Sequence, residues 1–303
     1  MTMAEKKTQD VLGREANMAM LQKERKANNA WNKLKRNRTA MIGFFIVCFM
    51  ILMAILAPML APYSPNAINP GIPFKGIGFK GHLLGTDDLG RDILSRIIYG
   101  ARVSLIVAVG ATLVGAGIGV LIGLVAGYFG GWLDIVLMRI MDGMFSFPFI
   151  LLAMILITVL GNGITNVIFA IGIANVPGFA RVTRGQVIIV KEEEYCNACR
   201  VVGVSDTRLL FLHILPNCVS QIIVYATLRV ASAIISEASL SFLGLGIALP
   251  TASWGSILRV GRDCLTTAPH VAGVAGMFIL VTVIGFNLLG DGIRDVMDPK
   301  MKQ

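Results

Sequence analysis

Six long apolar stretches are the feature that most limits how this chain can fold. They cover residues 39–62, 103–128, 133–160, 167–181, 219–245 and 271–289, of which 167–181 is the shortest. About 20 apolar residues in a row are what a helix needs to cross the hydrocarbon core of a bilayer. Because lipid offers the backbone no hydrogen bonds, such unbroken stretches cross it as helices. The sequence therefore predicts an all-α integral membrane protein with six transmembrane helices, in line with 55% hydrophobic and only 15% charged residues.

Basic residues before the first stretch predict the orientation of the helices. They are Lys6, Lys7, Arg14, Lys23, Arg25, Lys26, Lys33, Lys35, Arg36 and Arg38. Cytoplasmic segments are enriched in lysine and arginine, so we expect the N-terminal arm (1–38) in the cytoplasm, with an interfacial helix whose cations meet anionic lipid. Six crossings then return the C-terminal tail (291–303) to the same side. This distribution explains the net charge of +9 without a nucleic-acid partner.

The longest charged segment between the later stretches is residues 191–217, KEEEYCNACRVVGVSDTRLLFLHILPN. Its acidic start, its apolar residues at helical spacing and Gly203 predict a first amphipathic helix, and Ser205 can begin a second one that ends before Pro216. The contact residues that we expect are Tyr195, Ala198, Cys199, Gly203, Leu209, Phe211, Leu212 and Pro216. Amphipathic helices outside the membrane commonly occupy a groove of another protein, and a helix lying flat in the lipid interface is the alternative.

Two charged residues, Arg229 and Glu237, lie inside the stretch 219–245. Charges at membrane depth usually face the protein interior or a water-filled path. Both residues are therefore candidates for lining a route across the membrane. A structural ion pair with another helix is the alternative.

The second and third stretches carry features of helix packing. Glycines recur every four residues in the second, at Gly115, Gly119, Gly123 and Gly127. A stripe of glycines lets two backbones approach closely in lipid, so we expect this face to contact another helix. In the third stretch, Arg139 and Asp142 lie three residues apart on one face, where they can neutralise each other. Snorkelling of Arg139 to the nearby cytoplasmic interface is an equally good account of that residue. Pro148 predicts a kink.

Several kinds of active site are absent from the sequence. No glycine-rich loop ends in Gly-Lys-Ser or Gly-Lys-Thr, so we expect no ATP binding, no cofactor and no catalytic residue in this chain. The three histidines lie in different loops, and the single Cys-x-x-Cys pair lacks a second one, so no metal site is expected. An intramembrane aspartyl protease built on Asp142 and Asp291 is a remote alternative, because Asp291 fits a helix end better than a buried dyad. A stand-alone channel would leave the segment 191–217 unexplained.

Residues 191–217 resemble the cytoplasmic loop that marks ABC importer permeases. The positions that match are Gly203, Ile214, Leu215 and Pro216. The usual glutamate of the pattern is replaced by Asn197. Residues 82–105 are similar to a signature of the C-type permease subunit of dipeptide, oligopeptide and nickel importers. There the matches are Leu84, Gly85, Thr86, Asp87, Gly90, Arg91, Asp92, Ser95, Arg96, Tyr99, Gly100 and Arg102.

The resemblance implies a type I importer permease fold. A first helix (39–62) and an external loop and elbow (63–102) would precede the core permease domain (103–290), in which residues 191–217 form a coupling loop that docks into an ATPase subunit. The implied function is ATP-driven import of dipeptides or oligopeptides across the bacterial plasma membrane, with nickel or another small solute as the alternative. The implied partners are a second, similar permease, two cytoplasmic subunits that hold ATP and Mg²⁺, and an extracytoplasmic substrate-binding protein.

Overall fold

All the regular secondary structure among the described residues is helical, and two isolated β-bridges lie in the loop that precedes residue 93. The computed structural model describes residues 32, 34, 35 and 37–297, so most of the expected N-terminal arm and residues 298–303 lie outside it. In chain order the helices are α2 (Arg38–Ile55), α3 (Ala57–Leu60), α4 (Ile93–Phe129), α5 (Gly131–Phe145), α6 (Phe149–Leu160), α7 (Ile164–Val190), α8 (Glu194–Val201), α9 (Asp206–Leu209), the π-helix η1 (Leu210–Ile214), α10 (Leu215–Phe242), α11 (Trp254–Asp263) and α12 (Pro269–Met297).

Five helices are long and apolar enough to cross a membrane, namely α2, α4, α7, the continuous helix Asp206–Phe242 and α12. Together α5 and α6 qualify as a sixth span that is bent by 91°. The predicted all-α membrane fold is confirmed. The kink predicted at Pro148 is a complete break between α5 and α6, because a proline ring clashes with the preceding turn of a helix.

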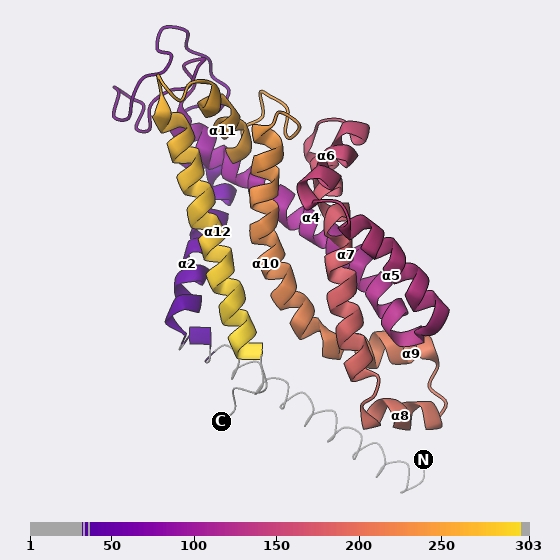
Figure 1. The fold of residues 1–303 in the computed structure, drawn as a ribbon. Helices are drawn as coiled ribbons and strands as arrows, with labels where there is room; N and C mark the ends of the chain where they lie inside the picture. Colours follow the sequence, from indigo (N-terminus) through magenta and orange to yellow (C-terminus); the bar gives the residue numbers. More distant parts are fainter. Residues whose placement is uncertain (1–31, 33, 36, 298–303) are drawn as a thin grey trace, which may run out of the picture.

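The bundle has two ends, which we name after the short helices that lie there. At the α8 end lie α8, the start of α2 and the last turns of α12, and at the α11 end lie α11 and the loop before α4 (Figure 1). The long helices run between these ends, and α4 crosses the bundle diagonally (Figure 1). The segment 191–217 therefore lies at the α8 end of the bundle.

Helix ends extend beyond the apolar stretches that predicted them. α4 begins at Ile93 rather than at residue 103, with Asp92 as its cap, since the Asp92 carboxylate accepts a hydrogen bond of 2.7 Å from the Ser95 backbone N–H. The expected elbow is thus the first part of α4. At the other end of the chain α12 continues to Met297, so residues 291–297 of the expected tail are helical.

A buried carboxylate, Asp87, organises the loop at the α11 end. It accepts a hydrogen bond of 2.7 Å from Arg91 Nε and lies 3.5 Å from Arg96 Nε. His82 Nδ1 lies 2.9 Å from the Asp92 carboxylate. These contacts fix the loop to the start of α4, since Asp87, Asp92 and both arginines are almost fully enclosed by protein.

The most extensive helix contact in the described bundle is between α4 and α7, and the glycine stripe of α4 lies at this contact. A Cβ atom at Gly119 would come within 2.6 Å of both the Val176 carbonyl oxygen and the Phe179 Cβ. At Gly115 it would come within 2.9 Å of Asn175 Cβ. No side chain larger than hydrogen fits at this distance, so the stripe sets how closely the two backbones approach.

Candidate functional site

The helix α8 joins α7 to the next span at the α8 end of the bundle. Its one buried residue is Cys196, whose Sγ donates a hydrogen bond of 3.4 Å to the Val190 carbonyl oxygen. Gly203 ends the α8 turn with a φ of 83°, and its backbone N–H lies 3.0 Å from the Arg200 carbonyl oxygen. Lys191 Nζ donates a 3.0 Å hydrogen bond to the Gly127 carbonyl oxygen at the end of α4. α8 is therefore tied to the end of α7, and the end of α7 is tied in turn to α4.

The outer face of this segment is apolar and exposed. We call it the docking surface, and it consists of Tyr195, Val201, Val202, Phe211 and Leu212. The exposed fractions are 88% for Val201, 82% for Val202 and 64% for Leu212. Ala198 is exposed as well, and Cys199 is half-buried. Exposed apolar side chains gathered on one short segment favour a surface that binds another protein.

Tyr195 links the docking surface to the span that follows. Its hydroxyl oxygen accepts a hydrogen bond of 3.0 Å from Asn217 Nδ2. Partial burial, together with the neighbouring Cys196, raises the pKa of the Tyr195 hydroxyl to about 12. The phenol is therefore neutral at any physiological pH.

The expectation that a second helix ends before Pro216 is wrong. Asp206–Phe242 is one continuous helix, in which the π-helix η1 lies just before Pro216. The Leu215 N–H donates to the Leu210 carbonyl oxygen, five residues back, and Pro216 follows in the first turn of α10. Proline has no backbone N–H to donate, and the wider π turn before it lets the helix continue without that hydrogen bond. Around this turn, Leu209 and Leu210 are buried, while Phe211 and Leu212 are exposed.

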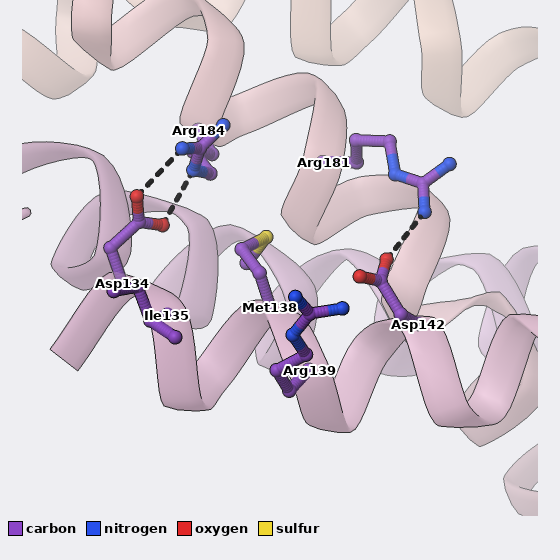
Figure 2. A pocket seen from close by; sticks show the side chains of 7 residues that line it. All are labelled: Asp134, Ile135, Met138, Arg139, Asp142, Arg181 and Arg184. Carbon is purple, nitrogen blue, oxygen red and sulfur yellow. Dashed lines mark hydrogen bonds and ion pairs between the residues drawn. The ribbon is translucent and has the colours of Figure 1, made fainter. Parts of the chain in front are cut away.

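A second candidate site is a charged pocket between α5 and α7. Its volume is about 410 Å³, and its lining consists of Asp134, Ile135, Met138, Arg139, Asp142, Arg181 and Arg184. Two ion pairs cross it (Figure 2). Arg184 donates two hydrogen bonds of 2.6 Å to Asp134, and Arg181 donates one of 2.9 Å to Asp142. We call this the α5–α7 pocket.

The expectation that Arg139 and Asp142 neutralise each other is wrong. Asp142 pairs with Arg181 of α7, whose guanidinium also lies 4.4 Å from the ring centre of Phe145. Arg139 forms no hydrogen bond or ion pair with any residue in the described part of the chain. Its side chain lies between the two ion pairs (Figure 2). The sequence showed which residues share a face of α5, but not that α7 places a second arginine opposite that face.

Glu237 is completely buried at the junction of α4, α10 and the loop before α11. Its carboxylate accepts hydrogen bonds from the hydroxyls of Ser241 at 2.9 Å, Ser253 at 3.0 Å and Ser104 at 3.0 Å. Ser104 Oγ also accepts a hydrogen bond of 3.2 Å from the Trp254 backbone N–H. No cation pairs with this carboxylate among the described residues. Its role in lining a route remains a prediction that these contacts do not support.

Arg229 lies two turns from Glu237 on α10 and makes different contacts. Its Nε donates a hydrogen bond of 2.7 Å to the Tyr225 hydroxyl oxygen, and its guanidinium lies 4.8 Å from the centre of the same ring. Tyr225 in turn packs edge-on against Phe179 of α7. The structure does not bring Arg229 and Glu237 together, and neither belongs to the α5–α7 pocket. A place for Arg229 on the route stays a prediction.

Sequence reasoning missed three of the residues that shape these sites. Asp134, Arg181 and Arg184 were not singled out, although each is a charge next to or inside an apolar stretch. Extending the stretch 167–181 by helical periodicity past Arg181 would have found Arg184. No group of three or more His, Cys, Asp or Glu residues that could hold a metal ion exists within residues 37–297.

Comparisons with known proteins place the chain in a family. Residues 119–303 match the family described as "Binding-protein-dependent transport system inner membrane component", and residues 27–75 match the "N-terminal TM domain of oligopeptide transport permease C". The dipeptide transport system permease protein DppC of Alkalihalophilus pseudofirmus is 44% identical over 90% of both chains. The glutathione transport system permease protein GsiD of Escherichia coli O157:H7 is 45% identical, again over 90% of both chains.

A solved structure shows the same fold. A chain of the MetNI methionine ABC transporter, in an inward-facing conformation, superposes with a TM-score of 0.54 at 19% sequence identity, covering 68% of this chain and 97% of that one. The chain thus belongs to the inner-membrane components of binding-protein-dependent transport systems, as a transmembrane permease subunit of an ABC importer and not as its ATPase.

Proposed function

We propose that this permease imports small peptides, dipeptides or glutathione among them, into the cytoplasm of a bacterium. The observation that carries the proposal is the similarity at 44–45% identity, over nine tenths of the chain, to one permease named for dipeptides and one named for glutathione. Both solutes are short peptides with free carboxylates. Import of nickel or another small solute is the alternative.

The α8 end is assigned to the cytoplasm on the basis of charge. The basic arm before α2 carries the excess of lysine and arginine that marks cytoplasmic segments. Since α8 lies at the same end of the bundle, the docking surface would also face the cytoplasm (Figure 1). The α11 end would then receive solute from an extracytoplasmic binding protein.

The docking surface would engage one of two cytoplasmic ATP-binding subunits. Its exposed side chains come from α8 and from the first turns of the helix Asp206–Phe242. Because that helix continues unbroken into a span, a displacement of Phe211 and Leu212 is transmitted directly to α10. Such coupling of a rigid element to the opening of a path is a common basis of alternating access. ATP and Mg²⁺ would be held by the partner subunits, and a second, similar permease would complete the path.

Uptake in cells tests the proposed substrate. A strain lacking this gene is compared with its parent and with a strain in which the gene is restored, using labelled dialanine, labelled glutathione and ⁶³Ni²⁺. We expect uptake of at least one peptide to fall with the gene and return with it, while nickel uptake stays unchanged. Loss of nickel uptake alone would establish the alternative.

A further inference from the structure

We propose that Arg139 is the binding site for the carboxylate group of a peptide as it passes through the α5–α7 pocket. This inference rests on the proposed function and adds a recognition element to it. Its basis is the balance of charge in the pocket, whose lining has three arginines and two aspartates. Both aspartates are matched by arginines of α7, which leaves one guanidinium without an acceptor.

Among the described residues, Arg139 is the one arginine of the pocket lining that has no ion pair, because the other two are already paired. Arg184 and Asp134 use two parallel hydrogen bonds, the geometry in which a guanidinium is most specifically bound. Arg181 and Asp142 are joined by one bond, and Phe145 stacks beneath Arg181. Arg139 lies between these pairs with five unused N–H donors in a planar fork (Figure 2). That fork matches a carboxylate.

The pocket must face water or protein, because lipid would not tolerate it. The side chains of Arg181 and Asp142 are 58% and 51% exposed within this chain. Both belong to spans that also expose apolar residues, such as Ile140 and Ile189. Charged groups at this position are costly against acyl chains and normally line an aqueous path. The charged face of α5 and α7 therefore belongs on the inside of the assembled transporter.

The size of the pocket fits a small solute. Its volume of about 410 Å³ lies within the range of about 300–1,000 Å³ that is typical of small-molecule sites. Ile135 and Met138 supply apolar surface beside the charges. A short peptide can place its terminal carboxylate on Arg139 while its side chains contact this apolar surface.

The test compares a dipeptide with its C-terminal amide in proteoliposomes that hold the complete transporter. Each peptide is supplied with enough binding protein to saturate transport. The variants are Arg139→Gln, Arg139→Lys and, as a matched control, Arg294→Gln, which changes an exposed arginine on α12. Co-purification with the ATP-binding subunits and basal ATP hydrolysis verify that each variant assembles.

We expect Arg139→Gln to lower the saturated rate for the free acid about tenfold and the rate for the amide by less than about twofold, because only the free acid loses a charge-assisted contact. Arg139→Lys is expected to retain an intermediate rate for the acid, and Arg294→Gln to change neither rate. Equal slowing of acid and amide by Arg139→Gln, or no slowing of either, would overturn the assignment. Failure of the unaltered transporter to carry any peptide would instead overturn the proposed function.

Discussion

Arg184 of α7 and Asp134 of α5 form a two-bond ion pair, each bond 2.6 Å long, near the α8 end of the bundle. The side chains are 33% and 17% exposed, so the pair is partly shielded from solvent. Arg181 and Asp142 form the neighbouring pair with one bond and with exposed fractions of 58% and 51%. The two pairs join the same helices but differ in geometry and shielding.

Removing the shielded pair should cost more stability than removing the exposed one. We expect Asp134→Ala to lower the free energy of unfolding by about 2 kcal/mol, since it leaves Arg184 partly buried without its partner. Asp142→Ala should cost about 0–1 kcal/mol. Thermal unfolding of the detergent-solubilised chain measures both, and the double variant Asp134→Ala with Arg184→Ala should be closer to the parent than Asp134→Ala alone. Equal shifts for the two aspartate variants would show that shielding does not distinguish the pairs.

Two glycines on α4 should respond in opposite ways to the addition of one methyl group. A Cβ atom at Gly119 would meet the Val176 carbonyl oxygen at 2.6 Å, whereas at Gly117 it would meet nothing within 4 Å. We expect Gly119→Ala to destabilise the chain by about 1–3 kcal/mol, or more if the helices cannot separate. Gly117→Ala should be neutral or slightly stabilising, because alanine is the better helix former. The melting temperatures of the two purified variants test this, and a similar loss in both would refute close packing of α4 on α7.

The fold was largely predictable from the sequence, and the sites much less so. Apolar length identifies the membrane crossings, because a helix in lipid must satisfy its own backbone. It does not identify helix ends, because α4 and the helix Asp206–Phe242 continue outside the apolar stretch where their side chains are buried against protein. Spacing along α5 placed Arg139 and Asp142 on one face, yet the partner of Asp142 comes from α7, and only tertiary structure reveals which arginine lies opposite.

The docking surface predicts a variant with weakened attachment of the ATP-binding subunits and slowed transport. Replacing both Phe211 and Leu212 by alanine removes exposed apolar area without disturbing the buried Leu209 and Leu210 beneath it. We expect reduced co-purification of the ATP-binding subunits and at least tenfold slower peptide uptake, because buried apolar anchors carry most of the energy of such contacts. The matched control is Met59→Ala, an equally apolar residue that is 84% exposed at the α11 end. Normal attachment and uptake in the double variant would exclude this surface as the docking site.

Variants of Glu237 distinguish a structural role of its carboxylate from a role in the transport path. Substitution by alanine leaves three hydroxyl groups without their shared acceptor in a fully buried place, so we expect a loss of about 2–3 kcal/mol in stability. Glutamine keeps one acceptor oxygen for Ser241 and Ser253, but its amide cannot accept from Ser104, whose hydroxyl must turn to receive a hydrogen bond instead. Glu237→Gln should therefore cost less than Glu237→Ala in melting temperature, with uptake falling only in proportion to the folded protein. Abolished uptake by a Glu237→Gln variant of unchanged melting temperature would show that the carboxylate acts in the path itself.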